Sequence, residues 1–306
     1  MTGLVIRPLT EGEESLFESL ADTGPASTSL VGMAAFGDSY SDMAARGEYR
    51  PEWAWVALRD GLVVARAAWW GGPDDDTPIA LDWFDFTDLD AAVQLLRAAP
   101  YRAEYSLSLP VDWRDNHAVA QAAEARIAAA EAAGMTLLVE RYTYRWTPGC
   151  GVPVQPGRLE FRPEPDDAVI LDVFRRVHRG TLDAHARRTL AASGLDAAAQ
   201  EALDFLRWLP SPREWWRLAY APGGDLVGLT VPARNPNHPV IGYIAVVPEQ
   251  RGHGYACDLL AEATRLLIAE GADRIVAGTD VGNTPMAAAF AKVGYPVTKL
   301  RIDLVY

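Results

Sequence analysis

The stretch Val240-Ile-Gly-Tyr-Ile-Ala-Val-Val247, followed by Pro248-Glu-Gln-Arg-Gly-His-Gly-Tyr-Ala256, decides the fold of this chain. Its first part is an almost continuous apolar run, which predicts a buried β-strand. Its second part is a glycine-bearing turn, after which apolar residues recur at helical spacing at positions 259, 260, 263, 266 and 267. We therefore expect a strand, a short turn and an amphipathic helix.

The turn has the features of a pyrophosphate site. Backbone N–H groups at a helix start lie at the positive end of the helix dipole, which favours a bound anion. Gly252 and Gly254 allow the backbone to come close to an anion, Arg251 adds a cation, and the small Ala256 keeps the helix entrance open. The chain has no G-x-G-x-x-G after a first strand and no G-x-x-x-x-G-K-[ST], so Rossmann and P-loop sites are not supported.

The spacing Arg251-x-x-Gly254-x-Ala256 resembles the acyl-CoA signature Q/R-x-x-G-x-G/A of the GNAT superfamily of N-acyltransferases. Downstream, Thr279-Asp-Val-Gly-Asn283 and Phe290-Ala-Lys-Val-Gly-Tyr295 resemble the second block of that family. The resemblance is strong over residues 240–297 and extends to 159–306 by the order of elements. Residues 4–146 resemble the family only as a degenerate copy.

This resemblance implies acetyl-CoA as co-substrate and gives each binding residue a role. The amides of residues 252–256 would hold the pyrophosphate, and the main chain of 244–246 would pair with pantetheine like an added strand. The Val246 N–H would polarise the thioester carbonyl, and Asn283 would hydrogen-bond the pantetheine arm. The residues expected to bind acetyl-CoA are Ile244, Ala245, Val246, Arg251, Gly252, His253, Gly254, Tyr255, Ala256, Asn283 and Phe290.

Phe290 departs from the family pattern, in which a tyrosine often stands seven residues after the Asn and protonates the departing thiolate. Phenylalanine has no proton to give. Either another group protonates the CoA thiolate, or the thiolate leaves without such help, or catalysis is impaired. A thiol pKa near 8.5 makes an unassisted thiolate tolerable at neutral pH. We expect Phe290 to pack against the pantetheine arm.

A weak internal repeat links the two halves of the chain. Three segments recur in the same order, at offsets of 155 to 163 residues; the pairs are 4–8 with 159–163, 53–65 with 216–228, and 77–83 with 238–244. The pattern of each half predicts the same order of elements: a strand, one or two helices, a hairpin, and then strand, helix, strand, helix and strand. Helices are expected over 90–98, 118–133, 197–208, 255–270 and 285–292.

The fold class expected from this order is α/β with a mixed α+β sheet, built as two tandem GNAT-like domains. Residues 1–147 would form a degenerate domain, which is structural or forms a wall of the substrate site. The Pro- and Gly-rich residues 148–158 would form a linker, and 159–306 the domain that binds acyl-CoA and catalyses transfer. In the first half, Asp82, Asp85, Asp88 and Asp90 surround the equivalent turn and would repel a pyrophosphate, so we expect no CoA there.

A base is needed because the attacking amine must lose a proton. Asp183 and His185 lie in the expected acceptor region, and they would converge in a turn but not on one helix face. His238 precedes the strand at 240–247 and either overhangs the cleft or belongs to a turn, and Tyr243 is either a core residue or a pocket donor. For each His alone, a surface or packing role is the simpler interpretation.

Composition narrows the classes of partner. The net charge of −13 disfavours a nucleic-acid binder and docking on anionic lipid. Residues 1–150 hold 11 arginines and 23 acids, a net charge of −12, so the half expected to bind CoA is close to neutral. Two cysteines, Cys150 and Cys257, support neither a disulfide framework nor a metal site, and no metal is expected. The N-terminal residues do not resemble a signal peptide, so a cytoplasmic protein is expected.

We therefore predict an acetyl-CoA-dependent N-acetyltransferase that acts on a small-molecule amine by direct transfer in a ternary complex. The alternatives are a catalytically weak or silent acyl-CoA-binding module, and a protein N-acetyltransferase. A longer acyl donor stays open, and the sequence indicates no oligomeric state.

Overall fold

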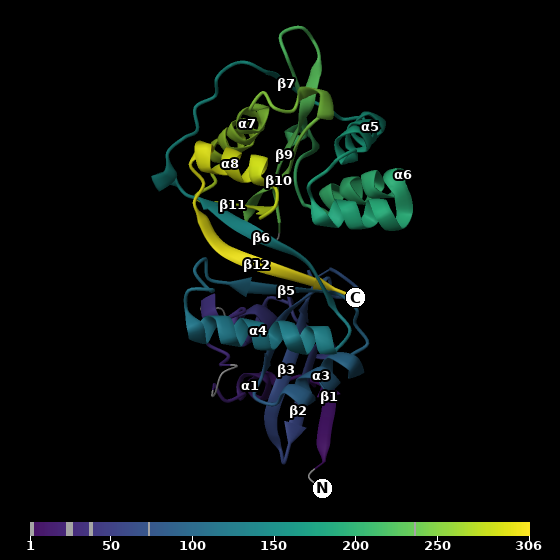
Figure 1. Cartoon of the computed structure of the whole chain (residues 1–306), viewed down its shortest axis with the longest axis vertical. Helices are drawn as coiled ribbons and strands as arrows, with labels where there is room; N and C mark the ends of the chain where they lie inside the picture. Colours follow the sequence, from purple (N-terminus) through teal and green to yellow (C-terminus); the bar gives the residue numbers. More distant parts are fainter. Residues whose placement is uncertain (1–2, 23–26, 37–38, 73, 236) are drawn as a thin grey trace. The chain divides into compact units, whose positions relative to one another are not determined.

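The computed structural model describes residues 3–22, 27–36, 39–72, 74–235 and 237–306 of the chain. These residues form two compact units, Met1–Glu140 with Lys299–Tyr306 and Arg141–Thr298. Figure 1 shows both and labels many of their helices and strands. Each unit is described by itself.

The two halves of the chain have the same order of elements. The first half contains β1 (Leu4–Pro8), α1 (Glu14–Glu18), α2 (Tyr40–Ala45), β2 (Ala54–Arg59), β3 (Leu62–Trp70), β4 (Ala80–Phe86), α3 (Leu89–Ala98), β5 (Glu104–Leu109), α4 (His117–Ala132) and β6 (Thr136–Trp146). The second contains β7 (Glu160–Pro163), α5 (Asp167–His178), α6 (Ala184–Trp208), β8 (Arg217–Tyr220), β9 (Leu226–Arg234), β10 (Pro239–Val246), α7 (Tyr255–Ala269), β11 (Ile275–Asp280), α8 (Thr284–Val293) and β12 (Val297–Val305). The mixed α/β class and the repeated order predicted from the sequence are confirmed.

The last strands of the two halves are exchanged between the units. In the second unit the strand order is β6-β11-β10-β9-β8-β7, and β6 pairs antiparallel with β11 from Ile275 opposite Trp146 to Asp280 opposite Arg141. In the first unit the order is β1-β2-β3-β4-β5-β12, and β12 pairs antiparallel with β5. Residues 141–147 therefore lie in the second unit and 299–306 in the first, which differs from the expected ranges 1–147 and 159–306. Sequence patterns report local structure, and this pairing is not local.

The expected helices are present with ends shifted by a residue or two, apart from α6. That helix begins at Ala184 rather than near residue 197, and Gly194 interrupts it with a non-helical conformation (φ 85°, ψ 179°). Gly194 thus divides α6 into two helical segments, the second of which is the segment predicted from the sequence. The Pro- and Gly-rich residues 148–158 form one short 3₁₀ turn, Pro148–Cys150, and otherwise no regular structure.

In the second unit the sheet has helices on both faces, with α5 and α6 on one and α7 and α8 on the other (Figure 1). Two apolar cores result. The core under α5 and α6 contains Phe174, Leu203 and Leu229, with Tyr243 and Ala245 packed against it. The core under α7 and α8 contains Leu260, Leu267, Phe290 and Tyr144. Because β10 contributes to both cores, its two faces meet different helices.

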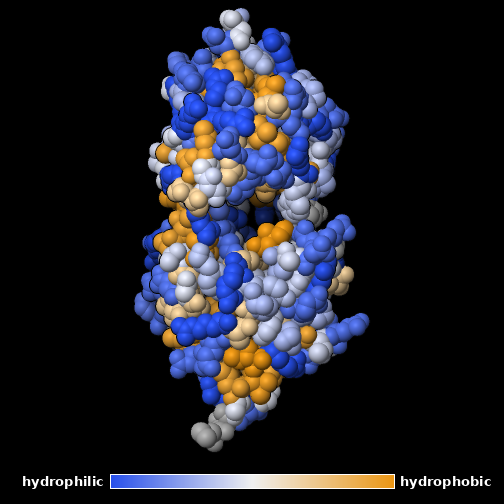
Figure 2. Space-filling view, turned by 90° about the vertical axis from the view of Figure 1, so that its right-hand side faces the viewer, coloured by the Kyte–Doolittle hydropathy of each residue, from blue (hydrophilic) through white to orange (hydrophobic). Residues whose placement is uncertain are grey.

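In the described part of the chain, no helix is both long and apolar enough to cross a bilayer. Large apolar side chains that are exposed include Leu62, Leu137, Val154 and Phe205. On the face drawn in Figure 2, apolar side chains form separate areas among polar ones.

Candidate functional site

The turn between β10 and α7 has an open cluster of backbone N–H groups. Gly252 (φ 85°) and Gly254 (φ 74°) both adopt the left-handed conformation that favours glycine. Gly254 is the N-cap of α7, and no side chain caps this helix. The first N–H groups of a helix have no partner within it, so those of α7 are available to an anion, and the helix dipole favours one there.

One edge of β10 is open beside this turn. The described residues of β10 and β11 pair at Val240 opposite Val276 only, so the two parallel strands separate after that point. On the other side, Val246 lies opposite Gly228 of β9, and the Val247 N–H donates to the Val227 carbonyl at 2.9 Å. Since N–H groups alternate in direction along a strand, the Val246 N–H points away from β9 toward the open edge.

Close approach of β9 to β10 depends on Gly228. A Cβ at this position would lie 2.1 Å from the Ala245 carbonyl oxygen, which no side chain can tolerate. In the sequence analysis residue 228 is only the last residue of a repeated segment, because the requirement for glycine arises from a pairing 17 residues along the chain. Gly228 therefore fixes the strand that presents the open edge.

Arg251, expected to add a cation for the phosphates, directs much of its guanidinium to main-chain carbonyls, and its contact with phosphate stays a prediction. It donates to the Val246 carbonyl at 3.2 Å, the Gly180 carbonyl at 3.1 Å and the Val177 carbonyl at 2.9 Å. A guanidinium has five N–H donors, and here three go to main-chain oxygens. Arg251 thus fastens the end of α5 to the glycine turn and fixes the peptide that follows the Val246 N–H.

A second arginine, not singled out by sequence, lies next to the turn. Arg158 donates to the His253 carbonyl at 3.2 Å, forms an ion pair with the buried Asp258, and lies over the Tyr255 ring at 5.0 Å. The His253 and Tyr255 rings stack, with centroids 5.6 Å apart. No motif contains Arg158, because its partners lie about 95 to 100 residues further along the chain. Arg158 thus ties the turn to the first helical turn of α7, and Asp258 balances its charge.

The two downstream residues expected at the acyl-CoA site, Asn283 and Phe290, occupy opposite parts of α8. Asn283 is its N-cap and accepts from the Met286 N–H at 3.4 Å, which leaves its amide N–H groups for a ligand. Phe290 is 2% exposed and stacks on Tyr144 of β6, with centroids 4.1 Å apart and planes at 16°. Contact between Phe290 and pantetheine stays a prediction, since the ring is buried against Tyr144.

Asp183 and His185 are brought together by Arg141, which the sequence analysis did not consider. Arg141 Nη1 lies 3.1 Å from His185 Nδ1, 3.4 Å from Asp183 Oδ2 and 3.2 Å from Asp280 Oδ1. Asp183 is also the N-cap of α6 and accepts from the Ala186 N–H. The arrangement therefore fits an ion cluster that fixes the start of α6.

Asp280, at the end of β11, is the buried member of this cluster. It is 2% exposed and accepts from the Ala184 N–H at 2.7 Å. Burial raises the pKa of its carboxyl, and the Arg141 charge opposes that rise. Asp280 thereby joins the end of β11, at the open edge, to the first turn of α6.

His238 lies at the wrong end of β10 for catalysis beside Val246. It closes a turn in which its N–H donates to Asn235 Oδ1 at 2.6 Å. Eight residues of extended strand, at about 3.3 Å each, separate it from Val246. His238 thus belongs to a turn, the simpler of the two expectations, and the expected overhang above the cleft is not compatible with this position.

Tyr243 has a partner that the sequence analysis did not identify. Its hydroxyl lies 3.2 Å from Nε2 of His178, the last residue of α5. Phe174, one turn earlier in α5, contacts both rings. Tyr243 is thus both packed against the core and hydrogen-bonded on the α5 face of β10. The two residues are 65 positions apart, so spacing could not reveal the pair.

The edge of β4 in the first unit corresponds to the open edge of β10. It has the same strand geometry, but a side chain occupies it. The Thr87 N–H donates to the Val64 carbonyl, as the Val247 N–H does to Val227, and β4 pairs with β5 at Ala80 and Leu81 only, among the described residues. Arg126 of α4, fully buried, donates to the Phe84 carbonyl at 3.0 Å. That carbonyl faces away from β3 by the same alternation, so a guanidinium occupies this edge three residues before Thr87, whereas Arg251 meets β10 only at Val246, the last residue of the strand.

The start of α3 is also closed to an anion. Only Thr87 and Asp88 separate β4 from α3, where eight residues separate β10 from α7. Asp88 caps α3 by accepting from the Ala91 N–H at 3.0 Å and forms an ion pair with Arg59. These hydrogen bonds, that to Ala91 foremost, hold the pKa of Asp88 below its usual value. A carboxylate therefore stands where a phosphate would bind.

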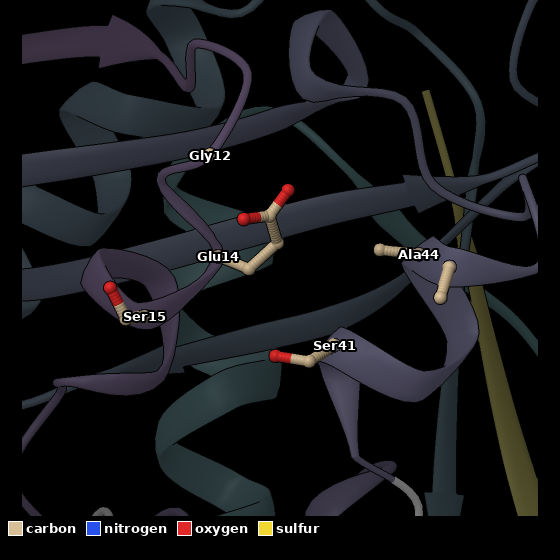
Figure 3. Close-up of a pocket in the computed structure, with 6 residues that line it drawn as sticks. Gly12, Glu14, Ser15, Ser41 and Ala44 are labelled. Atoms are coloured by element: carbon tan, nitrogen blue, oxygen red, sulfur yellow. The ribbon is translucent and has the colours of Figure 1, made fainter.

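Two hollows of about 510 and 530 Å³ lie in the first unit, beside α1 and α2. Figure 3 shows the first, which is lined by Glu14, Ser15 and Ser41 among others. The second is lined by Glu11, Glu14 and Glu52 among others. Their acidic lining is unsuited to a pyrophosphate.

Comparison with known proteins agrees with this geometry. Residues 184–295 match the model of the acetyltransferase (GNAT) family. The second unit thus carries a GNAT acetyltransferase domain. A search of curated proteins gives no match to the sequence.

Two solved structures with TM-scores above 0.5 support the fold over nearly the whole chain. A GCN5-related N-acetyltransferase from Sphaerobacter thermophilus has a TM-score of 0.57 at 13% identity, over 98% of this chain and 94% of that one. A GCN5-related glucosamine N-acetyltransferase region of a fungal multi-domain GH3 β-N-acetylglucosaminidase has a TM-score of 0.53 at 13% identity. The match covers 99% of this chain and 38% of that one. A tandem GNAT protein from the clavulanic acid biosynthesis pathway has a TM-score of 0.45 at 15% identity. The match covers 99% of this chain and 98% of that one.

Proposed function

We propose that the second unit transfers an acetyl group from acetyl-CoA to the amine of a small molecule, by direct attack in a ternary complex. The observation that carries this proposal is the open edge of β10 next to the uncapped start of α7. Pantetheine would pair with residues 244–246 as an added strand, and the pyrophosphate would meet the N–H groups of 252–256. The residues present fit an acyl-CoA in both respects.

The Val246 N–H would stabilise the oxyanion that forms when the amine attacks the thioester. It points to the open edge, and Arg251 holds the carbonyl of the same residue. A preorganised N–H donor acts strongly where it needs no reorganisation during the reaction. Asn283, whose oxygen caps α8, would donate its amide to the pantetheine arm.

The uneven charge supports a cationic acceptor. Residues 1–150 carry a net charge of −12 and the rest of the chain −1. Long-range attraction would raise the encounter rate of an amine that arrives as an ammonium ion. Acceptor kcat/KM should then fall as salt is raised, because salt screens such attraction.

A panel assay tests the proposal. Acetyl-CoA binding is measured by calorimetry, and free CoA thiol is followed with a panel of small amines, peptides with free N-termini and lysine peptides. Thiol release with small amines supports the proposal, and release with peptides alone indicates a protein N-acetyltransferase. Binding of one acetyl-CoA without release indicates a silent binding module, which the lack of a hydroxyl on Phe290 would favour.

The Val246 N–H is tested by Val246→Pro, with Val246→Ala as the matched control. Proline removes the N–H at a position where it makes no hydrogen bond to β9, so the ladder stays intact. We expect kcat to fall roughly 100-fold or more in Val246→Pro, while Val246→Ala keeps the N–H and most of the activity. Circular dichroism checks folding. Equal rates in the two variants would show that the Val246 N–H does not stabilise the oxyanion.

A further inference from the structure

His178 and Tyr243 form a pair that packing alone does not explain. His178 is 2% exposed, and its Nε2 lies 3.2 Å from the Tyr243 hydroxyl. Its other ring nitrogen, Nδ1, has no hydrogen-bond partner among the described residues. A buried polar atom without a partner is costly, so a histidine is a poor choice for a purely apolar core position.

The pair is held in place by two independent sets of contacts. The Phe174 ring stacks on His178 at 5.9 Å and meets Tyr243 edge-on at 5.0 Å. Arg251 donates to the carbonyls of Val177 and Gly180, which flank His178 in the chain. The same guanidinium donates to the Val246 carbonyl. One side chain therefore holds both the end of β10 at the proposed acyl site and the residues that flank His178.

Tyr243 stands on the face of β10 opposite α7. Its side chain packs in the core under α5 and α6, whereas Ile244 and Val246 pack on the α7 side. The open main-chain edge of β10 lies between these two faces. A thioester held at that edge by a CoA bound to α7 would therefore be approached by the acceptor from the side of Tyr243, and Tyr243 is partly exposed.

We propose, on the basis of the proposed function, that Tyr243 and His178 form a proton relay for the acceptor amine. As the amine nitrogen bonds to the thioester carbon and the carbon–sulfur bond breaks, the nitrogen gives its proton to Tyr243 Oη. The Tyr243 hydroxyl proton passes to Nε2 of His178, and the bonding pair leaves on sulfur as the CoA thiolate. His178 begins with its proton on Nδ1 and ends as an imidazolium, which later returns a proton to solvent.

The electrostatic surroundings suit these roles. Burial lowers the pKa of His178, and the charges of Asp183 and Glu201 oppose that effect. The imidazole is therefore neutral near pH 7 and able to accept a proton, while the two carboxylates favour the imidazolium that forms. Burial also raises the pKa of Tyr243, which keeps the phenol protonated; Asp183 adds to this rise and Arg251 opposes it. Tyr243 thus acts as a conduit for the proton and His178 as its final acceptor.

Tyr243→Phe tests the contact with the acceptor, with Tyr220→Phe on β8 as the matched control. The substitution removes a single hydroxyl, and Phe174 still packs on the ring. We expect kcat with a strongly basic amine to fall roughly 100-fold, as for loss of a general base, with an unchanged Kd for acetyl-CoA. The defect should shrink with weakly basic amines, whose nitrogen loses its proton more readily. A structural role alone would not produce that dependence on amine basicity.

His178→Gln tests the final acceptor, with His117→Gln at the exposed start of α4 as the control. In the wild type, kcat should fall as the pH is lowered through the pKa of His178, below its ordinary value of 6.5, because a protonated imidazole cannot accept a proton. This inflection should vanish in His178→Gln and persist in His117→Gln. Thermal melting and acetyl-CoA binding report whether His178→Gln is folded, and Tyr243→Phe gives an independent result if it is not.

The outcomes separate this inference from the function on which it rests. If the wild type transfers acetyl groups but Tyr243→Phe keeps its rate at every amine basicity, the relay is wrong and the function stands. If the wild type binds no acetyl-CoA, or binds it and transfers to no amine, the proposed function fails and the relay fails with it.

Discussion

The edges of β4 and β10 are built alike but differ in what lies beside them. Both strands separate from their parallel neighbour after one or two paired residues, and both point main-chain groups into the gap. In the second unit the gap is open beside a glycine turn and an uncapped helix. In the first, Arg126 fills the gap and Asp88 caps the helix. The shared fold therefore supplies the edge, and a few residues decide whether a ligand can use it.

Arg126→Met should have the largest effect, on the stability of the first unit. Arg126 is fully buried and donates to Phe84, Ala122 and Ser27 carbonyls and to Asp85. Removing it leaves buried acceptors unpaired, which costs about 3–5 kcal/mol. Chemical denaturation measures the loss, with the exposed Arg114→Met as control. If the variant loses no stability, or gains a second acetyl-CoA site, the idea that the filled edge is structural is wrong.

Gly254→Asp makes the start of α7 resemble that of α3. The new carboxylate would cap the helix and repel the pyrophosphate. We expect acetyl-CoA affinity to fall at least 100-fold, measured by calorimetry. Gly254→Asn has the same shape without the charge and tolerates the left-handed conformation, so it should lose much less. Equal losses in both variants would show that backbone conformation, and not charge, closes the α3 site.

Asp82→Asn tests a partly buried carboxyl in the first unit. Burial raises the pKa of Asp82 to about 7, against the hydrogen bond from Tyr49, whose hydroxyl lies 2.7 Å away. The unfolded chain has the lower pKa of 3.8, so between about pH 4 and 7 the folded state binds more protons and stability falls as pH rises. The fall should be roughly 2–4 kcal/mol. Denaturation across this range should show a flatter profile for Asp82→Asn, and an unchanged slope would contradict the shift.

Asp88→Ala should have the smallest effect. It removes the cap of α3, which costs about 1 kcal/mol, measured as a drop in the free energy of unfolding. The short connection between β4 and α3 and the side chain of Arg126 stay in place, so acetyl-CoA should still bind with a stoichiometry of one per chain. A second equivalent of bound acetyl-CoA would show that Asp88 alone excludes it.

The order of elements and the glycine turn before α7 could be predicted from the sequence, because both are encoded locally. Alternation, helical spacing and the glycines at 252 and 254 are visible within about 20 residues. The contacts of Arg251 with Val177 and Gly180, and of His178 with Tyr243, join segments more than 60 residues apart. A single sequence carries no pattern for such pairs, which is why the main-chain contacts of Arg251 were not foreseen and His178 was not identified as a partner of Tyr243.

The exchange of last strands has a consequence for biosynthesis. Residues 299–306 complete the sheet of the first unit by pairing with β5, although they are translated after all of the second unit. A nascent chain that has emerged only to residue 150 can form β1 to β5 but lacks the strand that covers their edge. During translation the first unit therefore has an exposed edge strand, which is a known route to misassociation. Removal of residues 299–306 should accordingly lower the stability of the first unit, the half of the molecule that is made first.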